Sequence, residues 1–283
     1  MFYICTKFLN ISRSSISKMK KNISYTFTAL FFFLSFANAQ RHEIGGQMGM
    51  SNLVGDIGRT NYVLQKPLGD ISETGLPFYG GVMYRMNFNP YQTVRVNLGF
   101  NNVQFDDRYA KENYRRNRQL RGTNSVFSAD LLFEYNFLPV NDEQVSMLSP
   151  YIFGGISGLY MNAAKPELTI ASATNIQVNY KQEKVFTMGL PFGIGLKYKF
   201  NYNWAFSGEF MFRPTFSDQV DYSSLEEKDI TVKNTSLNDE NTAAIVQGFI
   251  KQRNIGNPNS KDWINSATLI LSYSFGRPPC YCK

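Results

Sequence analysis

Residues 127–137 read FSADLLFEYNF, and an apolar side chain recurs there at every second position. The intervening positions carry Asp130, Glu134 and Asn136. Residues 94–101, VRVNLGFN, repeat the pattern with Arg95 among the polar positions. A period of two is the signature of a β-strand with one apolar and one polar face. Because the apolar face is aromatic and the polar face is charged, both segments predict the wall of a transmembrane β-barrel.

Eight segments alternate in this way and predict eight strands. They are residues 42–50, 78–88, 94–101, 127–137, 151–161, 186–200, 204–216 and 263–275. Most reach the roughly 9–11 residues that a tilted membrane strand needs. Pro191 lies inside the sixth segment and cannot donate to a strand ladder, so we expect a bulge or kink there. The fifth segment is rich in glycine, and the sequence leaves open whether Phe153 and Leu159 or Ile152 and Ile156 face the lumen.

The connections between the predicted strands alternate between short and long. Asn89–Tyr91 and Asn201–Asn203 are short turns, and residues 139–148 form a longer third connection; we expect all three on the periplasmic side. The opposite rim receives residues 51–76, 106–124, 162–184 and 217–262, and the last of these is long enough to carry structure of its own. The predicted fold is therefore an all-β, eight-stranded antiparallel transmembrane β-barrel, residues 40–276, with long extracellular loops and short periplasmic turns.

Aromatic residues close many of the predicted strands, as expected at the two membrane interfaces. They include Phe88, Phe137, Tyr198, Phe200, Trp204, Trp263, Tyr273 and Phe275. A soluble β-sandwich or lipocalin-like barrel is the alternative, since its strands also alternate. It would place apolar residues inside, whereas here the small and charged residues form the predicted inner face, and an outward aromatic wall requires lipid.

Residues 1–39 predict a cleaved export signal that directs the chain to the bacterial outer membrane. Lys20 and Lys21 form the positive region, Leu30–Leu34 the apolar centre and Ala37–Ala39 the cleavage site. The apolar stretch is shorter than the roughly 20 residues of a membrane helix. Met19, directly before the lysines, is a candidate start of this leader.

The net charge of the chain comes mostly from this leader. The full sequence has 29 basic and 22 acidic residues, and five of the basic residues and none of the acidic ones precede residue 40. The remaining 24 basic residues give the mature chain a net charge of about +2. The basic isoelectric point is therefore no indication of a nucleic-acid partner.

Charged side chains gather on the predicted inner face. They are Arg85, Arg95, Asp130, Glu134, Lys197, Lys199, Glu209 and Arg213. An unpaired ion in a narrow lumen costs several kcal/mol, so we expect a salt-bridge network that fills the barrel. An ion pathway is the alternative interpretation.

The mature chain offers little material for catalysis. Its single histidine, His42, lies at the start of the first strand without a predicted nucleophile beside it. We predict no enzymatic activity, no cofactor and no metal centre. The acid pairs Asp106–Asp107, Glu226–Glu227 and Asp239–Glu240 are interpreted as solvated loop acids, with calcium binding as the alternative.

The C-terminal tail, residues 277–283, reads RPPCYCK and follows the last strand. Its Cys280 and Cys282 are the only mature thiols, and we expect them in the oxidising periplasm. A disulfide between them would close a small strained ring. We favour bonding to a partner protein, with an intramolecular ring or a reduced pair as alternatives.

Three stretches of the mature chain resemble the PorG-like outer-membrane proteins of Bacteroidota type IX secretion systems. They are QRHEIG at 40–45 followed by SNLVGDIGRTNY at 51–62, LPFGIGLKY at 190–198, and the end of the chain from Asp262–Trp263 through SFGR at 274–277 to CYC at 280–282. The resemblance implies an eight-stranded barrel associated with the periplasmic ring of the secretion and gliding machinery, formed by PorK/GldK-like and PorN/GldN-like proteins. It implies neither an enzyme nor a secretion pore.

Three functions remain to be separated. The leading one is a non-enzymatic component of type IX secretion that anchors the periplasmic ring to the outer membrane, with the cysteine tail as contact. The alternative is an OmpX- or OmpA-barrel-like surface protein that binds ligands or cells through its extracellular loops. A small-solute channel is the third.

Overall fold

The computed structural model describes residues 41–64, 71–142, 146–172, 175–233, 239–257 and 260–276. The predicted export signal and the tail that carries Cys280 and Cys282 lie outside these residues.

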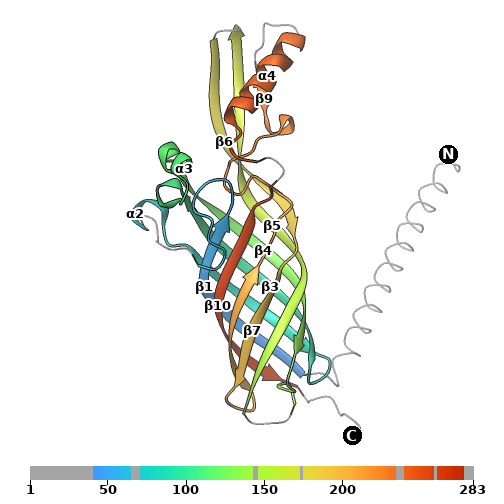
Figure 1. Ribbon diagram of the computed structural model, residues 1–283. Coiled ribbons are helices and arrows are strands. Elements are labelled where there is room, and N and C mark those ends of the chain that lie inside the picture. The colour runs from blue at the N-terminus through green and yellow to red at the C-terminus, as the bar shows by residue number, and fades with distance from the viewer. Residues whose placement is uncertain are drawn as a thin grey trace, which may run out of the picture.

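Eight strands pair in a closed ring (Figure 1). In ring order they are β1 (Arg41–Val54), β2 (Phe78–Asn87), β3 (Gln92–Asp106), β4 (Arg121–Asn136), β5 (Met147–Ser172), β7 (Phe192–Lys199), β8 (Trp204–Phe212) and β10 (Trp263–Phe275). All neighbours are antiparallel, and the predicted eight-stranded barrel is confirmed.

The predicted sixth strand is interrupted at its proline. β6 (Asn175–Gly189) ends before Leu190, and β7 begins at Phe192. Both pair with β5, which therefore runs past the break without interruption. The Leu190 amide donates to the Pro214 carbonyl at 3.0 Å, and the Gly155 amide donates to the Pro191 carbonyl at 2.9 Å. The disturbance expected at Pro191 is a break in the strand ladder, because proline has no N–H to donate, and it is not a bulge, since the register with β5 is the same on both sides.

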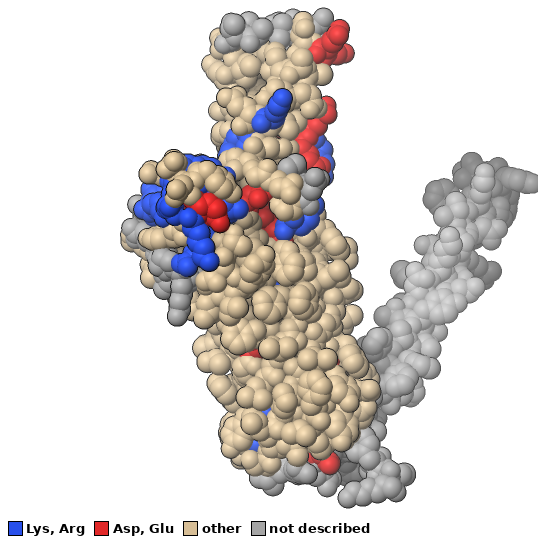
Figure 2. All heavy atoms as spheres, in the orientation of Figure 1, with Lys and Arg blue, Asp and Glu red and all other residues tan. Residues whose placement is uncertain are grey.

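The two faces of the wall differ as the alternation predicted. Every second residue from Phe186 to Phe200 is exposed, and Phe186 itself is 67% exposed. Figure 2 shows this outer wall almost free of charged atoms on the face it presents. In β5, Tyr151, Phe153 and Leu159 are buried inside while Ile152 and Ile156 face outward, which settles the open question about that strand. An apolar exterior around charged interior side chains is the pattern of a barrel wall in lipid.

The two rims differ in the length of their connections. At one end, called the short-turn rim, residues 88–91 join β2 to β3 and residues 200–203 join β7 to β8. His42 pairs with Phe275 there, so β1 begins and β10 ends at this rim. The aromatic residues predicted at the strand ends include Phe137, Tyr198 and Trp204, which are exposed near this end of the wall. The connection between β4 and β5 also lies at this rim, because β4 ends beside the start of β3 and β5 begins beside the end of β7. The other connections lie at the opposite end, called the long-loop rim.

The prediction of a loop over residues 162–184 is wrong. β5 and β6 continue as a hairpin above the barrel, and their pairing extends from Ser157 and Gly189 to Ser172 and Asn175 (Figure 1). These residues form strands because another segment of the chain packs on one face of the hairpin. Leu168 and Ile170 are fully buried under it, so these residues are stabilised as strand outside the membrane as well.

The segment that packs on the hairpin belongs to the long connection between β8 and β10. This connection has secondary structure of its own, as predicted. A 3-10 turn (Glu227–Asp229) precedes β9 (Thr231–Lys233), which pairs in parallel with β5 at residues 167–169. α4 (Asp239–Arg253) then buries Val246 against Leu168 and Ile170.

Two further short helices lie at the long-loop rim beside the barrel, α2 (Ile71–Thr74) and α3 (Asn113–Arg118), with a 3-10 turn at Asp107–Tyr109. Within the described residues, no helix combines the length and the apolar character needed to cross a membrane.

Candidate functional site: the filled lumen and its two rims

Arg85 of β2 stands at the centre of the lumen. Its Nε donates to both carboxylate oxygens of Glu134, at 2.9 and 3.0 Å. Its Nη2 donates to Glu209 at 3.3 Å, and its Nη1 lies 3.6 Å from Glu43. One fully buried guanidinium therefore compensates carboxylates from three other strands.

A second arginine completes this cluster. Arg95 of β3 pairs with Glu134 at 2.9 Å and with Glu209, to which the Tyr151 hydroxyl also donates. The Arg95 guanidinium lies 4.8 Å from the centre of the Phe153 ring. Cation–π contacts of this kind favour a desolvated arginine. The inward aromatics of β5 thus form one wall of the ionic cluster.

Towards the short-turn rim the network continues through lysines. Lys197 pairs with Glu43 at 2.6 Å and donates to the side chain of Asn141 at 2.9 Å. Lys199 donates to the Asp142 carbonyl at 2.7 Å and lies over the Tyr202 ring. Towards the long-loop rim, Arg213 pairs with Asp130 at 2.9 Å.

The structure therefore brings all eight predicted lumen charges inside the barrel. Each is at most 3% exposed, and seven of the eight take part in the ion pairs above. Removing one partner of such a buried pair costs about 3–5 kcal/mol, because it leaves an uncompensated charge. The lumen consequently behaves as a polar core.

Three members of the network were absent from the predicted set. The inward position of Glu43 could have been inferred from the alternation of β1, because the next residue, Ile44, faces outward. The glycines of β1 make this alternation hard to recognise in the sequence. Tyr151 lies on the strand whose facing the sequence left open. Asn141 enters from the connection between β4 and β5, and no strand pattern marks such a residue.

An apolar cluster closes the lumen at the long-loop rim. Val220, from the segment after β8, is fully buried against Leu53, Val103 and Val126. Its backbone is fixed from both sides, because its carbonyl accepts from Asn124 Nδ2 at 2.9 Å and its amide donates to Asp262 Oδ2 at 2.9 Å. The segment around Val220 is therefore a stopper built into the mouth of the barrel.

Carboxylates hold this stopper in place. Asp221 accepts from the Ile57 amide at 2.8 Å and from the Ser223 amide at 2.9 Å. Burial, together with the neighbouring Asp221 and Asp218 carboxylates, raises the pKa of Asp262 to about 9. Burial likewise raises the pKa of Asp221. Near pH 7, Asp262 is therefore mainly protonated and holds the Val220 amide as a neutral acid.

His42 lies on the outer face of β1 at the short-turn rim. Its Nδ1 is 2.7 Å from the Tyr84 hydroxyl, and its ring stacks on Tyr84 and on Phe275. The histidine thus belongs to the aromatic surface of the wall.

The interpretation of the acid pairs as solvated is wrong for Asp106–Asp107, which are buried, whereas Glu226–Glu227 and Asp239–Glu240 are exposed. Asp107 pairs with Arg118 and accepts from the Gly58 amide at 2.8 Å, and Asp106 pairs with Arg108. Glu226 pairs with Lys228 at 2.6 Å. In the part of the chain that the structure describes, no group of three or more His, Cys, Asp or Glu side chains is arranged to hold a metal ion.

The closed ring, the apolar exterior and the filled lumen define an outer-membrane β-barrel of eight strands. The chain belongs to the DUF6089 family, a domain of unknown function whose model matches residues 20–283. No curated protein matches the chain.

Several solved structures of outer-membrane proteins are similar to it. Ail, the attachment invasion locus protein of Yersinia pestis, solved with the heparin analogue sucrose octasulfate, is 13% identical with a TM-score of 0.40, over 84% of this chain and 99% of Ail. OprG of Pseudomonas aeruginosa is 10% identical with a TM-score of 0.39, over 85% and 97% of the two chains. The N-terminal β-barrel domain of OprF from the same organism is 13% identical with a TM-score of 0.35, over 84% and 98%. At these identities and scores the likeness carries no functional information.

Proposed function

We propose that this protein is a non-enzymatic outer-membrane anchor, and specifically a component of the type IX secretion and gliding machinery that holds a periplasmic ring complex at the membrane. The observation that carries the anchor proposal is the double closure of the lumen. Arg85 and its carboxylates fill the middle, and Val220 stops the mouth. A barrel filled in this way has its two rims as working surfaces.

The sequence resemblance to PorG-like proteins supports the specific assignment. It points to PorK/GldK-like and PorN/GldN-like ring proteins as partners, with outer-membrane lipid around the wall and no nucleic acid. In this proposal the short-turn rim faces the periplasm. β10 ends at that rim, so the tail after Phe275 emerges on the side where the ring would lie.

The tail with Cys280 and Cys282 is the proposed contact to the ring. Replacing both cysteines by serine is expected to reduce the recovery of ring proteins with the affinity-tagged barrel and to impair secretion. The matched control replaces Ser274, a lumen-side residue at the end of β10, by alanine, which leaves the tail intact. Undiminished recovery and normal secretion in the double variant would refute the role of the tail.

Non-reducing gels of whole membranes test the chemistry of the contact separately. An intermolecular disulfide predicts a band of higher mass that disappears with reductant and is absent from the double serine variant. Migration as a monomer with and without reductant would exclude a stable covalent link, while leaving a non-covalent contact open to the co-purification test.

Binding of ligands or cells through the long-loop rim is the second candidate. The observation that favours it is the ordered layer of β9 and α4 on the β5–β6 hairpin, which stands beyond the membrane wall. Replacing residues 227–257 by a short glycine-serine linker separates the two candidates. The anchor proposal expects secretion to survive this change, whereas surface binding expects function to be lost while the double serine variant remains active.

The absence of catalysis is part of the proposal. It is supported by the position of His42, whose ring nitrogen faces Tyr84 on the lipid side of the wall. A hydrolytic activity of the purified barrel that disappears in His42→Ala would contradict it.

A further inference from the structure

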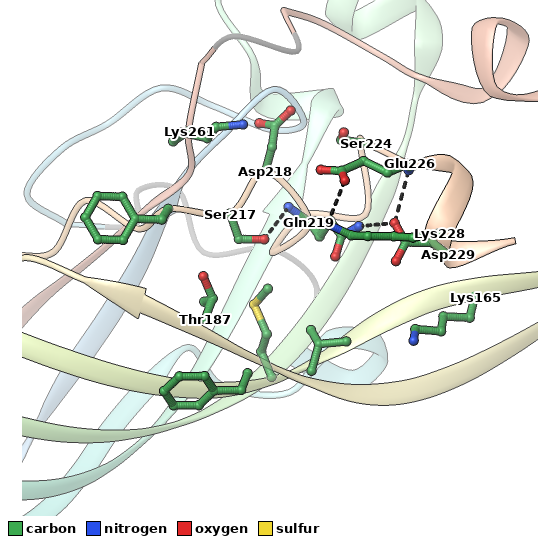
Figure 3. A pocket seen from close by; sticks show the side chains of 14 residues that line it. Lys165, Thr187, Ser217, Asp218, Gln219, Ser224, Glu226, Lys228, Asp229 and Lys261 are labelled. Carbon is green, nitrogen blue, oxygen red and sulfur yellow. Dashed lines mark hydrogen bonds and ion pairs between the residues drawn. The ribbon is translucent and has the colours of Figure 1, made fainter. Parts of the chain in front are cut away.

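A cavity of about 420 Å³ lies at the long-loop rim, where β6 leaves the wall. The chain after β8 is still hydrogen-bonded to β6 at Phe216, whose amide donates to the Met188 carbonyl at 2.9 Å. Beyond it β6 rises with the hairpin, while the chain from Ser217 onward turns over the mouth. Figure 3 shows the cavity between these two segments.

Asp218 is the unusual group in this cavity. It is only 5% exposed, and neither of its buried carboxylate oxygens accepts a hydrogen bond of ordinary geometry, although the Ser224 side chain lies close enough to lower its pKa. Burial and the neighbouring Asp56 and Asp221, partly offset by Lys261 and Ser224, bring that pKa to about 7. A buried acceptor without a donor destabilises the folded state. The cavity therefore presents an acceptor that a ligand with a hydroxyl or N–H donor would satisfy.

The other charged groups of the cavity already have partners, and some of these lie outside it, since Lys165 pairs with Glu183 at 3.3 Å. Asp229 accepts from Gln219 Nε2 at 2.5 Å and from the Glu226 amide at 3.0 Å. Lys228 pairs with Glu226. Counting all lining residues, three lysines face three carboxylates. This balance favours a ligand without net charge over a phosphate or a polyanion.

Two exposed aromatic rings border the opening. Phe186 is 67% exposed and Phe216 60% exposed. Two residues above Phe186 on the same face of β6, the Lys184 ammonium lies over the rings of Phe127 and Tyr160. An ammonium above outward aromatic rings is the arrangement expected at a lipid interface. The cavity thus opens beside the boundary between the apolar wall and the polar surface.

We propose that this cavity binds a neutral saccharide, with a sugar hydroxyl donating to Asp218 and the apolar face of a sugar ring packing on Phe186 and Phe216. The volume lies in the range of about 300–1,000 Å³ that small-molecule sites occupy. The saccharide could come from a soluble glycan or from the headgroup of a glycolipid in the adjacent leaflet. This inference stands independently of the ring-anchor proposal.

The test uses the full mature chain in phospholipid nanodiscs, with the matched variants Asp218→Asn and Asp239→Asn. An asparagine side chain is nearly isosteric with aspartate, and the change at position 218 removes a charge from beside Asp56 and Asp221. The Asp218→Asn variant is therefore expected to fold at least as well as the parent. Asp239 lies in the first turn of α4, outside the cavity.

The first arm measures binding of soluble neutral mono-, di- and trisaccharides on an array. We expect at least one to bind, with affinity reduced about tenfold or more in Asp218→Asn, as for loss of a hydrogen bond to a charged group, and unchanged in Asp239→Asn. A Phe216→Ala variant is expected to bind the same saccharide more weakly, because it lacks the aromatic ring on which the sugar would pack.

The second arm identifies by mass spectrometry the glycolipids that co-purify from native outer membranes. Depletion from Asp218→Asn but not from Asp239→Asn would assign the headgroup as the source. The proposal is overturned if neither arm finds a saccharide, if binding is unchanged in Asp218→Asn, or if calorimetry with calcium chloride finds Ca²⁺ to be the only ligand that depends on Asp218.

Discussion

Arg85 on β2 reaches past β3 to Glu134 on β4, and its Nε lies 2.9 Å from one carboxylate oxygen and 3.0 Å from the other. The side chains are 0% and 1% exposed. The same guanidinium contacts Glu209 and Glu43, so strands on opposite sides of the ring depend on one side chain. The barrel is therefore cross-braced through its interior.

Removing this brace should destabilise the folded barrel strongly. Arg85→Met keeps the approximate volume but leaves the buried carboxylates short of one cation, and we expect a loss of about 3–5 kcal/mol. Urea unfolding in liposomes, followed by the difference in gel mobility between folded and unfolded barrel, measures it. Lys228→Met is the control, because Lys228 and its partner Glu226 have side chains that are 71% and 60% exposed, and such a surface pair contributes about 0–1 kcal/mol. If both variants lost the same free energy of unfolding, the buried network would contribute no more to stability than an exposed ion pair.

Glycines on the two faces of the wall should differ in their tolerance of side chains. A β-carbon at Gly195 would overlap the ring of Tyr151, whereas one at Gly46 would meet nothing within 4 Å. Gly195→Val is expected to cost at least about 1–3 kcal/mol by overpacking and to displace the Tyr151 hydroxyl from Glu209. Gly46→Val should be nearly neutral, since it adds an apolar group to the outer face. The same urea titration reports both variants, and a folded, stable Gly195→Val protein would argue against the described packing of the lumen.

The closed lumen predicts very low conductance. Purified protein in planar bilayers should give no regular single-channel steps, because the ionic cluster and Val220 obstruct the path in series. Deleting residues 217–224 alone should leave the bilayer silent, since the cluster around Arg85 remains. Steps of uniform size in the parent protein would revive the small-solute channel.

The stopper at the mouth should loosen as pH rises. The raised pKa of Asp262, about 9 against an ordinary 3.8, means that the closed mouth retains a proton which the opened segment releases above about pH 4. Local stability is therefore greatest at acidic pH and declines as pH rises towards 9, by up to roughly tenfold in the opening equilibrium per pH unit. Hydrogen exchange of residues 217–224, corrected for intrinsic rates, measures this opening. Asp262→Asn should flatten the dependence, and a parent protein whose opening is independent of pH would contradict it.

The wall was predictable because lipid and lumen impose opposite demands on alternate residues. The outward run from Phe186 to Phe200 and the inward charges from Arg85 to Arg213 both follow from that constraint. The position of the break between β6 and β7 follows from the chemistry of Pro191. These inferences need only local sequence.

The parts that escaped prediction depend on contacts between distant segments. In the upper part of the hairpin above the wall, Leu168 and Ile170 lie opposite Val178 and Ile176, so one face is apolar there. That face is buried because α4 covers it from a segment some 70 residues later, and nothing in the local sequence indicates this cover. The meeting of Asp218, Asp221 and Asp262 at one point is likewise a product of the folded mouth. No alternation in the sequence marks it.

The unbroken β5 has a mechanical consequence. One strand of 26 residues begins at the short-turn rim, contributes Tyr151 and Phe153 to the ionic cluster, and ends at the tip of the hairpin. At about 3.3 Å per residue it is a rod of roughly 85 Å. A sideways force on the hairpin would therefore be transmitted along β5 into the barrel wall. There it would be resisted by the contacts of Tyr151 and Phe153 with the buried arginines and Glu209.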